Sequence, residues 1–312
     1  MQVHTFLPTS RILEKSALSV GTFDGVHCGH QRLIEVLKRE AAARDLPSAV
    51  LTFQDMPYCF FRPDDCPKLL TLPHEKITAF EKLGINHLFI VPFDKQIANQ
   101  SYEEFASGVL RDKLGLELLV AGPDFALGKD REGNLDALKI LGNEIGFETH
   151  VLNEKIECAG APISSTRVRG CVENGEVKIA KEMLGGAFGF EGKVVAGKQL
   201  GRTIGVPTIN LEIHPRKVLA AKGVYAARAF FAGEGESTPH LAALSIGNNP
   251  TVTDENSIKI EFHVIDATIA VPPKHVRLEL VAWLRNEEKF DSLDALILQM
   301  QSDIARAKTI LS

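Results

Sequence analysis

The chain has 312 residues, more than one hydrophobic core usually organises, so we expect two domains. Its 35 lysines and arginines against 40 aspartates and glutamates give a formal net charge of −5, which argues against binding nucleic acid through a broadly basic surface. No apolar run approaches membrane-spanning length, and the N-terminal segment does not resemble a signal peptide, so we expect no membrane partner.

The cysteines are odd in number and include no Cys-x-x-Cys pair; they are Cys28, Cys59, Cys66, Cys158 and Cys171. This pattern predicts neither a disulfide framework nor a zinc ribbon. A reducing, cytoplasmic location fits it best, and small-molecule or nucleotide ligands stay open.

The first half of the chain alternates short β-rich runs with amphipathic helical patterns, the order that builds a doubly wound parallel α/β sheet. The predicted strands are Ala17–Val20, Ala49–Phe53, His87–Val91, Leu118–Ala121 and Glu148–Leu152. The predicted helices are Gln31–Ala43, His74–Leu83, Tyr102–Leu114 and Leu135–Glu144. Ser101 and Glu104 form a capping-box pattern at the start of the third of these helices.

A further helical stretch, Thr166–Leu184, ends at a glycine pair where the composition changes, so we place a domain boundary there and predict domains 1–185 and 186–312. Short strands without helices between them follow, which indicates an antiparallel barrel or sandwich. These strands are Lys193–Ala196, Val224–Phe231, Leu241–Ile246, Lys259–Val264 and Val276–Trp283. One amphipathic helix, Leu293–Ile310, closes the chain.

The stretch GTFDGVHCGHQ (Gly21–Gln31) follows the first predicted strand and leads into a helix. Ligands of open α/β sheets bind at this carboxyl end of the strands. Gly21, Gly25 and Gly29 would let backbone N–H groups approach phosphate oxygens, and the helix N-terminus favours negative charge. His27 and His30 can share one face of the entering turn.

Two other interpretations of these histidines stay open. They could bind zinc, although no third and fourth ligand stands nearby in the sequence, or they could simply pack or cap the helix. Phosphate binding is the interpretation that we favour.

The His-x-Gly-His pattern after a strand resembles the signature of the nucleotidyltransferase superfamily. Together with the downstream segment ISSTRVR (Ile163–Arg169), the longer motif resembles the FMN adenylyltransferase module of bacterial bifunctional riboflavin kinase/FAD synthetases. Serine and threonine hydroxyls at a helix start can hold one phosphate while an arginine spans two oxygens, although the same residues also occur as an ordinary helix cap.

This resemblance implies that the phosphate of FMN attacks the α-phosphate of ATP directly and releases pyrophosphate, with Mg²⁺ as cofactor. It implies that His27 and His30 stabilise the ATP phosphates and that Arg167 offsets the charge of the leaving pyrophosphate. It further implies nucleotide and phosphate binding by the surrounding motif residues, which are Gly21, Phe23, Asp24, Gly25, Gly29, Ser165 and Thr166.

In the second half, GRTIGVPTINL (Gly201–Leu211) carries Thr208 and Asn210, whose side chains point to one side if the segment is extended. A hydroxyl and an amide oxygen are suitable ligands for Mg²⁺, and a polar strand face is the alternative. The run resembles the Gly-Arg-x-x-Gly-x-Pro-Thr-x-Asn motif of the riboflavin kinase module, a compact β-barrel, so Gly201 and Arg202 are expected to contact nucleotide phosphates.

Further segments match this module in order, and they are Gly223–Tyr225, Ser245–Thr251, Ile260–His263 and Leu284–Phe290. The resemblance implies that Glu261 is the general base that accepts the proton of the ribityl 5′-hydroxyl of riboflavin, which attacks the γ-phosphate of ATP. Without it, a lone strand glutamate would be interpreted as a solvated surface residue.

The chain departs from the family pattern at three places. Met56 stands in the segment where a Pro-His-Pro-like turn is usual, Ala126 and Leu127 replace an arginine and a phenylalanine, and the turn over 267–273 lacks the usual Asp-Leu-Tyr-Gly. The sequence therefore predicts an enzyme that makes FMN and then FAD from riboflavin and ATP. The alternatives are a riboflavin kinase with a degenerate adenylyltransferase domain, a non-catalytic flavin-binding protein, and an adenylyltransferase for another phosphate acceptor. A weak homo-oligomer is left open.

Overall fold

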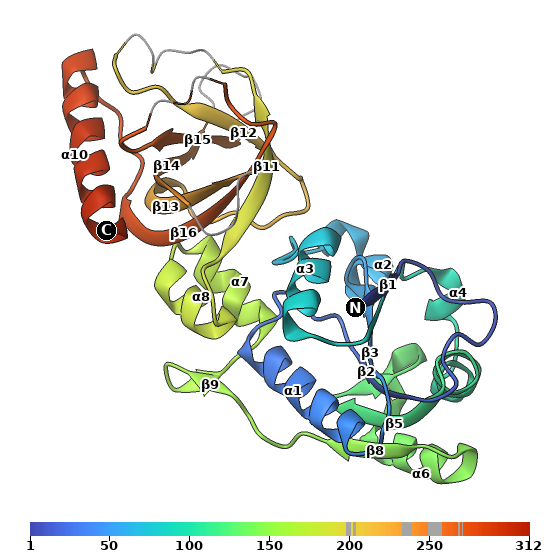
Figure 1. Ribbon diagram of the computed structural model, residues 1–312. Coiled ribbons are helices and arrows are strands. Elements are labelled where there is room, and N and C mark those ends of the chain that lie inside the picture. The colour runs from blue at the N-terminus through green and yellow to red at the C-terminus, as the bar shows by residue number, and fades with distance from the viewer. Residues whose placement is uncertain (198–200, 202–203, 233–238, 249–257, 268, 270) are drawn as a thin grey trace. The chain divides into compact units, whose positions relative to one another are not determined.

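The computed structural model describes residues 1–197, 201, 204–232, 239–248, 258–267, 269 and 271–312. The chain forms two compact units, Met1–Ser165 and Thr166–Ser312 (Figure 1). Residues 166–185 belong to the second compact unit, whereas the sequence-based boundary assigns them to the first domain. Those limits, 1–185 and 186–312, stay a prediction.

The first unit is built on a parallel sheet with the strand order β1-β4-β3-β2-β5-β8. Its strands are β1 (Gln2–His4), β2 (Ser16–Val20), β3 (Ser48–Phe53), β4 (His87–Val91), β5 (Leu116–Ala121) and β8 (Glu148–Val151). The predicted doubly wound sheet is therefore confirmed, and β1 is an edge strand that the sequence did not indicate. The order reverses between β2 and β5, so the loop after β2 lies at the point where such sheets bind ligands.

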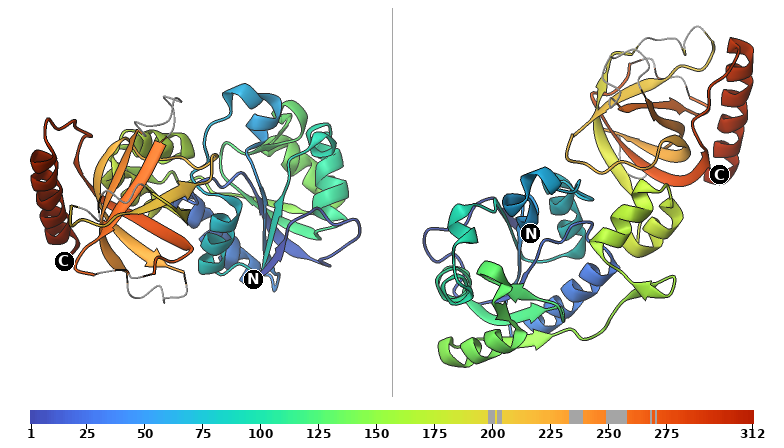
Figure 2. Two further views of the ribbon diagram at one scale, coloured as in Figure 1. Left: turned by 90° about the horizontal axis from the view of Figure 1, so that it is seen from above. Right: turned by 180° about the vertical axis from the view of Figure 1, so that it is seen from behind.

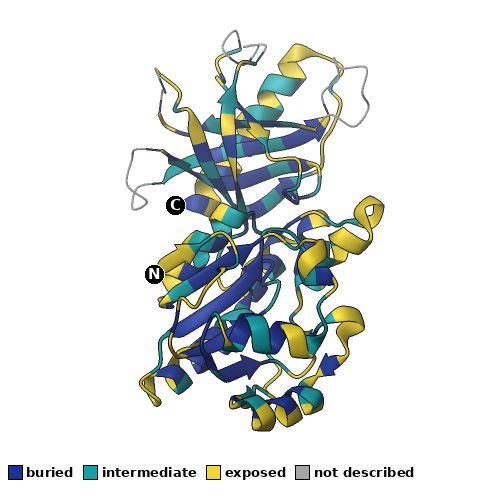
Figure 3. Cartoon of the chain, turned by 90° about the vertical axis from the view of Figure 1, so that its right-hand side faces the viewer, coloured by how far each residue is buried: buried dark blue, intermediate teal, exposed yellow. Residues whose placement is uncertain are grey.

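Helices cover both faces of this sheet, as the views in Figures 1 and 2 show. On one face α1 (Cys28–Ala42) and α3 (Pro73–Leu83) contribute Leu37 and Phe80 to a buried cluster. The other face is covered by α5 (Tyr102–Glu104), the π-helical segment η2 (Phe105–Arg111) and α6 (Leu135–Ile145). The four central strands β2, β3, β4 and β5 are almost entirely buried, whereas the edge strands β1 and β8 are partly exposed (Figure 3).

Short elements fill the connections of this unit. They are α2 (Pro57–Phe61), η1 (Pro63–Asp65), α4 (Lys95–Ala98), β6 (Ala126–Leu127), η3 (Lys129–Arg131), β7 (Gly133–Asn134), β9 (Glu157–Cys158) and β10 (Ala161–Pro162). The cysteine pattern indicated no disulfide framework and did not reveal the one bond that joins Cys59 to Cys66. The turn between α2 and η1 brings their Cα atoms to 4.7 Å, a proximity that sequence spacing alone does not reveal.

The single helix predicted over 166–184 is two helices, α7 (Ser165–Glu173) and α8 (Val177–Leu184). Gly175 separates them with a φ of +76°, and a Cβ atom there would lie 1.8 Å from a ring carbon of Trp283. Only glycine fits both this backbone conformation and this close approach, so the helix breaks at Gly175.

In the second unit, six of the described strands close into an antiparallel barrel with the order β11-β12-β15-β14-β13-β16. They are β11 (Gly189–Val195), β12 (Ile209–Ile213), β13 (Gly223–Phe231), β14 (His240–Asn248), β15 (Ile258–Val264) and β16 (His275–Arg285). The barrel interpretation is thus confirmed over the sandwich. Residues alternate along β15, where Phe262 is fully buried and Glu261 lies on the opposite, outward side.

The C-terminal helix α10 (Leu293–Leu311) runs along the outside of the barrel, as all views show (Figures 1 and 2). Its Ala307 and Leu311 pack against Ala226 and Ala282 of the barrel wall. The helix α10 therefore covers part of the outer barrel surface, and the second candidate site lies between the two.

Candidate functional sites

The first candidate site is the loop that connects β2 to α1. His27 is the N-cap of α1, and its Nδ1 atom accepts a hydrogen bond of 3.3 Å from the backbone N–H of His30. The two imidazole rings are stacked, with centroids 3.6 Å apart. His27 therefore does cap the helix, and in its neutral form the proton must sit on Nε2, which leaves that N–H available for a ligand.

Burial keeps both histidines neutral at physiological pH. Desolvation lowers the pKa of His27 to about 4. Desolvation also lowers the pKa of His30 well below its usual value, and the charge of Lys76, together with that of His27 when His27 is protonated, acts in the same direction. The pair can therefore offer hydrogen bonds to an anion, while a full positive charge must come from elsewhere.

Asp24 fixes the loop from inside. Its buried carboxylate accepts hydrogen bonds from the backbone N–H groups of Leu70 and Thr71, at 3.1 and 3.0 Å. The backbone has positive φ at Gly25 and also at Phe23 and Val26, where such a conformation is uncommon. Strained residues of this kind persist where surrounding contacts determine them, and they concentrate at functional sites.

The remaining motif residues of the first unit gather around this loop. The ring of Phe23 contacts that of His30 edge-on at 5.1 Å, and Gly21 and Gly29 lie against the rings of Phe23 and His27 respectively. Ser165 Oγ donates a hydrogen bond of 2.7 Å to the backbone oxygen of Asp24, which ties the second motif to the first.

Thr166 and Arg167 follow Ser165 in the first turn of α7 and count with the second compact unit. The Thr166 side chain is exposed and that of Arg167 is half-buried. Their roles in binding phosphate stay predictions.

Sequence reasoning missed Lys76, which is fully buried beneath this loop. Its ammonium group donates to the backbone oxygens of Thr22 at 2.9 Å and Phe53 at 2.8 Å. Burial lowers its pKa to about 8, against the opposing charges of Asp24 and Asp55. One signal in the sequence could have indicated this buried lysine. Lys76 stands four positions before Phe80, on the apolar side of a helix, and a charged side chain at such a position needs buried hydrogen-bond partners.

The zinc interpretation gains no support from the described part of the chain. Among those residues, the cluster of three potential metal-ligating side chains contains Asp55, Cys59 and Cys66 and neither histidine. The histidine loop instead offers hydrogen-bond donors and a helix N-terminus, a combination suited to phosphate.

The second candidate site is a cavity of about 380 Å³ between the outer barrel face and α10. Its lining includes Gly201, Thr208, Val224, Ser245, Lys259, Glu261, His263, Arg285, Glu287, Phe290, Met300 and Asp303. The cavity therefore brings together Gly201, Thr208 and Glu261 from the predicted set. Arg202 lies outside the described residues.

Asn210 and Glu261 are direct partners across β12 and β15, and Ser245 of β14 is the partner of Glu261 on its other side. Opposite residues of an antiparallel pair project from the same face of the sheet, so the amide, carboxylate and hydroxyl form one row. The Glu261 carboxylate also forms an ion pair of 2.6 Å with Lys259, two residues earlier on the same face.

Thr208 lies just before β12 and faces the cavity. The segment that carries it is fastened to β15, because His263 Nδ1 donates a hydrogen bond of 2.8 Å to the backbone oxygen of Pro207. Asn210 is buried and packs directly against Gly197. A Cβ atom added to Gly197 would lie 2.1 Å from the side-chain amide nitrogen of Asn210. The oxygens of Thr208 and Asn210 are hard ligands, and this donor pair fits Mg²⁺.

An ion pair joins the barrel to α10 at the wall of the cavity. The guanidinium of Arg285 donates from Nε and Nη2 to the Asp303 carboxylate at 2.8 to 3.0 Å, and Gln299 donates to the same carboxylate. Both ionic side chains are largely buried. This contact positions α10 as one wall of the second site.

Comparisons with known proteins match both halves of the chain. A family model described as FAD synthetase matches residues 9–167, and one described as riboflavin kinase matches residues 184–311. A bifunctional riboflavin kinase/FMN adenylyltransferase of Escherichia coli strain K12 is 35% identical over 296 residues, which cover 95% of this chain and 92% of the relative. The Haemophilus influenzae protein of the same description is 34% identical, covering 97% and 96% of the two chains.

A solved structure, described as a macrolide-efflux protein from Streptococcus pneumoniae, superposes with a TM-score of 0.87 at 28% identity and covers 99% of each chain. This similarity establishes that the fold is shared over the whole length. Over the described residues of the present chain, none of the helices has the length and apolar character needed to cross a membrane.

Proposed function

Because the chain belongs to the family of bifunctional riboflavin kinase/FMN adenylyltransferases, we propose that it phosphorylates riboflavin to FMN and then adenylylates FMN to FAD. ATP is the co-substrate of both steps. The observation that carries this proposal is that each unit holds its own polar site, the histidine loop in one and the barrel cavity in the other. We expect the enzyme to act in the cytoplasm.

In the barrel, Glu261 is the proposed base. Its carboxylate accepts the proton of the ribityl 5′-hydroxyl as the oxygen of that group bonds to the γ-phosphorus and the bond to ADP breaks. The ion pair with Lys259 holds the free carboxylate toward the cavity and must yield or reorient when riboflavin binds. Ser245, beside Glu261 in the same row, offers a hydroxyl to orient either substrate.

Thr208 and Asn210 would hold Mg²⁺ together with the ATP phosphates. When bound, the ion neutralises phosphate charge. The buried amide of Asn210 is fixed by its contact with Gly197, so the strand supplies its oxygen in one orientation.

In the first unit, the FMN phosphate attacks the α-phosphorus of ATP and pyrophosphate leaves. The neutral His27 donates from Nε2 to a phosphate oxygen, and the α1 N-terminus directs backbone N–H groups to the same region. Arg167 and Thr166 are proposed to bind the leaving pyrophosphate, and Ser165 to hold the loop through its bond to Asp24. Gly25 and Gly29 keep the backbone accessible to the nucleotide.

The departures from the family pattern leave the first site assembled. Leu127, which replaces a ring, is buried in the core of the first unit, and Ala126 pairs with Asn134 in a short hairpin. Met56 is the N-cap position of α2. These changes lie outside the histidine loop and remove neither histidine, which favours the bifunctional enzyme over one that retains only riboflavin kinase activity.

The test is a chromatographic time course of purified protein with riboflavin, ATP and Mg²⁺. We expect FMN to appear first and FAD to follow, and omission of Mg²⁺ to stop both. FMN without FAD would refute the adenylyl transfer and leave a kinase. Neither product, with flavin nevertheless bound, would refute the enzymatic proposal in favour of a flavin-binding protein.

A further inference from the structure

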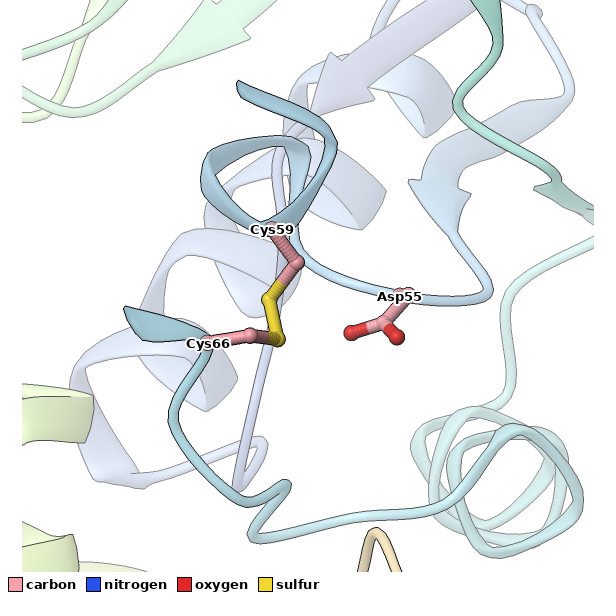
Figure 4. A group of neighbouring side chains, drawn as sticks. All are labelled: Asp55, Cys59 and Cys66. Atoms are coloured by element: carbon pink, nitrogen blue, oxygen red, sulfur yellow. A yellow bond between two sulfur atoms is a disulfide. The ribbon is translucent and has the colours of Figure 1, made fainter. Parts of the chain in front are cut away.

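The disulfide between Cys59 and Cys66 lies in a segment that the proposed chemistry does not use. Cys59 is in α2 and Cys66 directly follows η1, and their sulfur atoms are bonded, as Figure 4 shows. Both cysteines are half-buried, so small reductants and oxidants can reach them. We call residues 56–67, which contain the bond, the disulfide loop.

Residues that flank the disulfide loop on both sides are tied to the histidine site. Upstream, the backbone oxygen of Phe53 shares the Lys76 ammonium group with Thr22, which belongs to the β2–α1 loop. Downstream, Leu70 and Thr71 donate their backbone N–H groups to Asp24 of the same loop. A change in the disulfide loop therefore acts on two anchors of the turn that carries the histidines.

The helical elements of the disulfide loop lie at the surface. Neither α2 nor η1 buries a residue, and α2 is too short to be stable alone. Tyr58 donates a hydrogen bond to Asp65 across the loop, and Phe60 and Phe61 contact the ring of Phe93. Because α2 and η1 contribute no buried side chain, the covalent bond adds a constraint on the conformation of this segment that its packing does not supply.

Asp55 lies beside the disulfide. Its carboxylate oxygen lies with both sulfur atoms in one group whose atoms are within 4.8 Å of one another (Figure 4). A negative charge at this distance opposes the formation of a thiolate on either cysteine. Because the thiolate is the attacking form in thiol oxidation, Asp55 slows the oxidation of the reduced pair.

We propose that Cys59 and Cys66 form a reversible redox pair that adjusts adenylyl transfer in the first unit. This inference rests on the proposed function of the histidine site. Disulfides of cytoplasmic proteins are usually transient and redox-sensing, which is the behaviour expected of an accessible bond that closes a short surface loop. The second unit contains neither cysteine, so its activity provides an internal reference.

A peroxide is a sufficient oxidant. The thiolate of one cysteine attacks the peroxide, the O–O bond breaks, and a sulfenic acid and one water form. The second thiolate attacks the sulfenic sulfur, the S–O bond breaks and a second water leaves. Two thiols thus lose two electrons and two protons to one hydrogen peroxide, and a dithiol reductant reverses the change.

The chemical test is a count of alkylatable thiols in the full chain, with mass spectrometry of the peptide that contains both cysteines. Treatment with hydrogen peroxide should remove two thiols, at Cys59 and Cys66, and dithiothreitol should restore them. The Asp55→Asn variant should be oxidised by peroxide faster than the wild type, because the charge that opposes the thiolate is removed. Irreversible oxidation, or one zinc ion bound to the reduced pair that prevents disulfide formation, would overturn the proposal.

The functional test compares the oxidised and reduced full chain in two assays. Reduction should lower kcat/KM for FMN in FAD synthesis about fivefold, at the lower end of ordinary coupling between two sites, and leave riboflavin phosphorylation unchanged. The double variant Cys59→Ser/Cys66→Ser should behave as the reduced protein in both states, and the control Cys158→Ser should keep the response.

Equal FAD synthesis in the two redox states would overturn this inference alone. A redox response that persists in the double serine variant would do the same. A protein that makes FMN but no FAD in either state would refute adenylyl transfer itself, and with it the regulation proposed here.

Discussion

Asn210 and Glu261 face each other across β12 and β15 as direct partners of the antiparallel ladder. Their side chains project from the outer barrel face, and Ser245 continues the row on β14. The barrel thereby holds a proposed metal ligand beside the proposed base, on strands rather than on loops. Rigid strands keep such groups in a defined geometry, which is what transfer of a phosphoryl group requires.

Replacement of the proposed base, Glu261→Gln, should reduce riboflavin phosphorylation by about 10²- to 10⁴-fold, because an amide cannot accept the hydroxyl proton. Synthesis of FAD from supplied FMN should be unchanged. The matched control is Glu279→Gln, which removes a carboxylate of the same barrel that is also paired with a basic residue two positions earlier, Arg277. The measurement is the initial rate of each variant with riboflavin and, separately, with FMN. A fully active Glu261→Gln enzyme would exclude Glu261 as the general base.

Asn210→Ala should raise the Mg²⁺ concentration needed for half-maximal kinase rate on the order of 10- to 100-fold, because one oxygen ligand is lost. Glu212→Ala, an exposed residue two positions further along β12, serves as the control. The measurement is kinase rate as a function of Mg²⁺ at saturating ATP. An unchanged Mg²⁺ dependence would show that Asn210 has a structural role only.

Lys76→Met should weaken FAD synthesis and leave FMN synthesis intact, because the oxygens of Thr22 and Phe53 lose their common donor. Desolvation still lowers the pKa of His30 in the variant, but the charge of Lys76 no longer adds to it, so this pKa should rise. Titration of the histidine ring protons by NMR measures the change. A His30 pKa equal to that of the wild type would contradict the electrostatic part of this account.

The pH dependence of stability follows from the same lysine. Its pKa is lowered to about 8 in the folded chain, so between pH 8 and its ordinary value of 10.5 the unfolded chain binds more protons. The contribution of Lys76 to the free energy of unfolding therefore rises with pH over this window. Denaturant titrations at several pH values should show this slope in the wild type and a smaller one in Lys76→Met; equal slopes would contradict the assignment.

Asp303→Ala should lower the free energy of unfolding of the second unit by about 3–5 kcal/mol, because it leaves the largely buried Arg285 without its carboxylate. On the same helix, Lys308 forms an exposed ion pair with Asp266 of the turn after β15, and Lys308→Ala should cost about 1 kcal/mol or less. Thermal and denaturant unfolding measure both. Equal effects of the two variants would argue against the buried pair as the anchor of α10.

Local patterns predicted much of this molecule. The strand before Gly21, the helix after His27 and the barrel strand around Glu261 follow from periodicity and turn residues, and the structure contains all three. The helix predicted over 166–184 was wrong at Gly175, where a positive φ and local hydrogen bonds end α7; the ring of Trp283, more than one hundred positions away, also leaves no room there for a Cβ atom.

Long-range contacts account for what the sequence did not reveal. Lys76 is partnered by backbone oxygens that are 54 and 23 positions away, and no local pattern indicates such acceptors. The pairing of Asn210 with Glu261 depends on the register of two strands that are distant in the sequence. The approach of Cys59 to Cys66 depends on an irregular turn, for which residue spacing gives no rule.

The most direct test of two separate sites is the product time course of His27→Ala with riboflavin, ATP and Mg²⁺. We predict that FMN forms at the wild-type rate, because the barrel is untouched. FAD should form about 10²- to 10³-fold more slowly, as expected when a hydrogen-bond donor to a reacting group is removed. FAD synthesis at the wild-type rate, or parallel loss of FMN and FAD in a folded variant, would contradict the account.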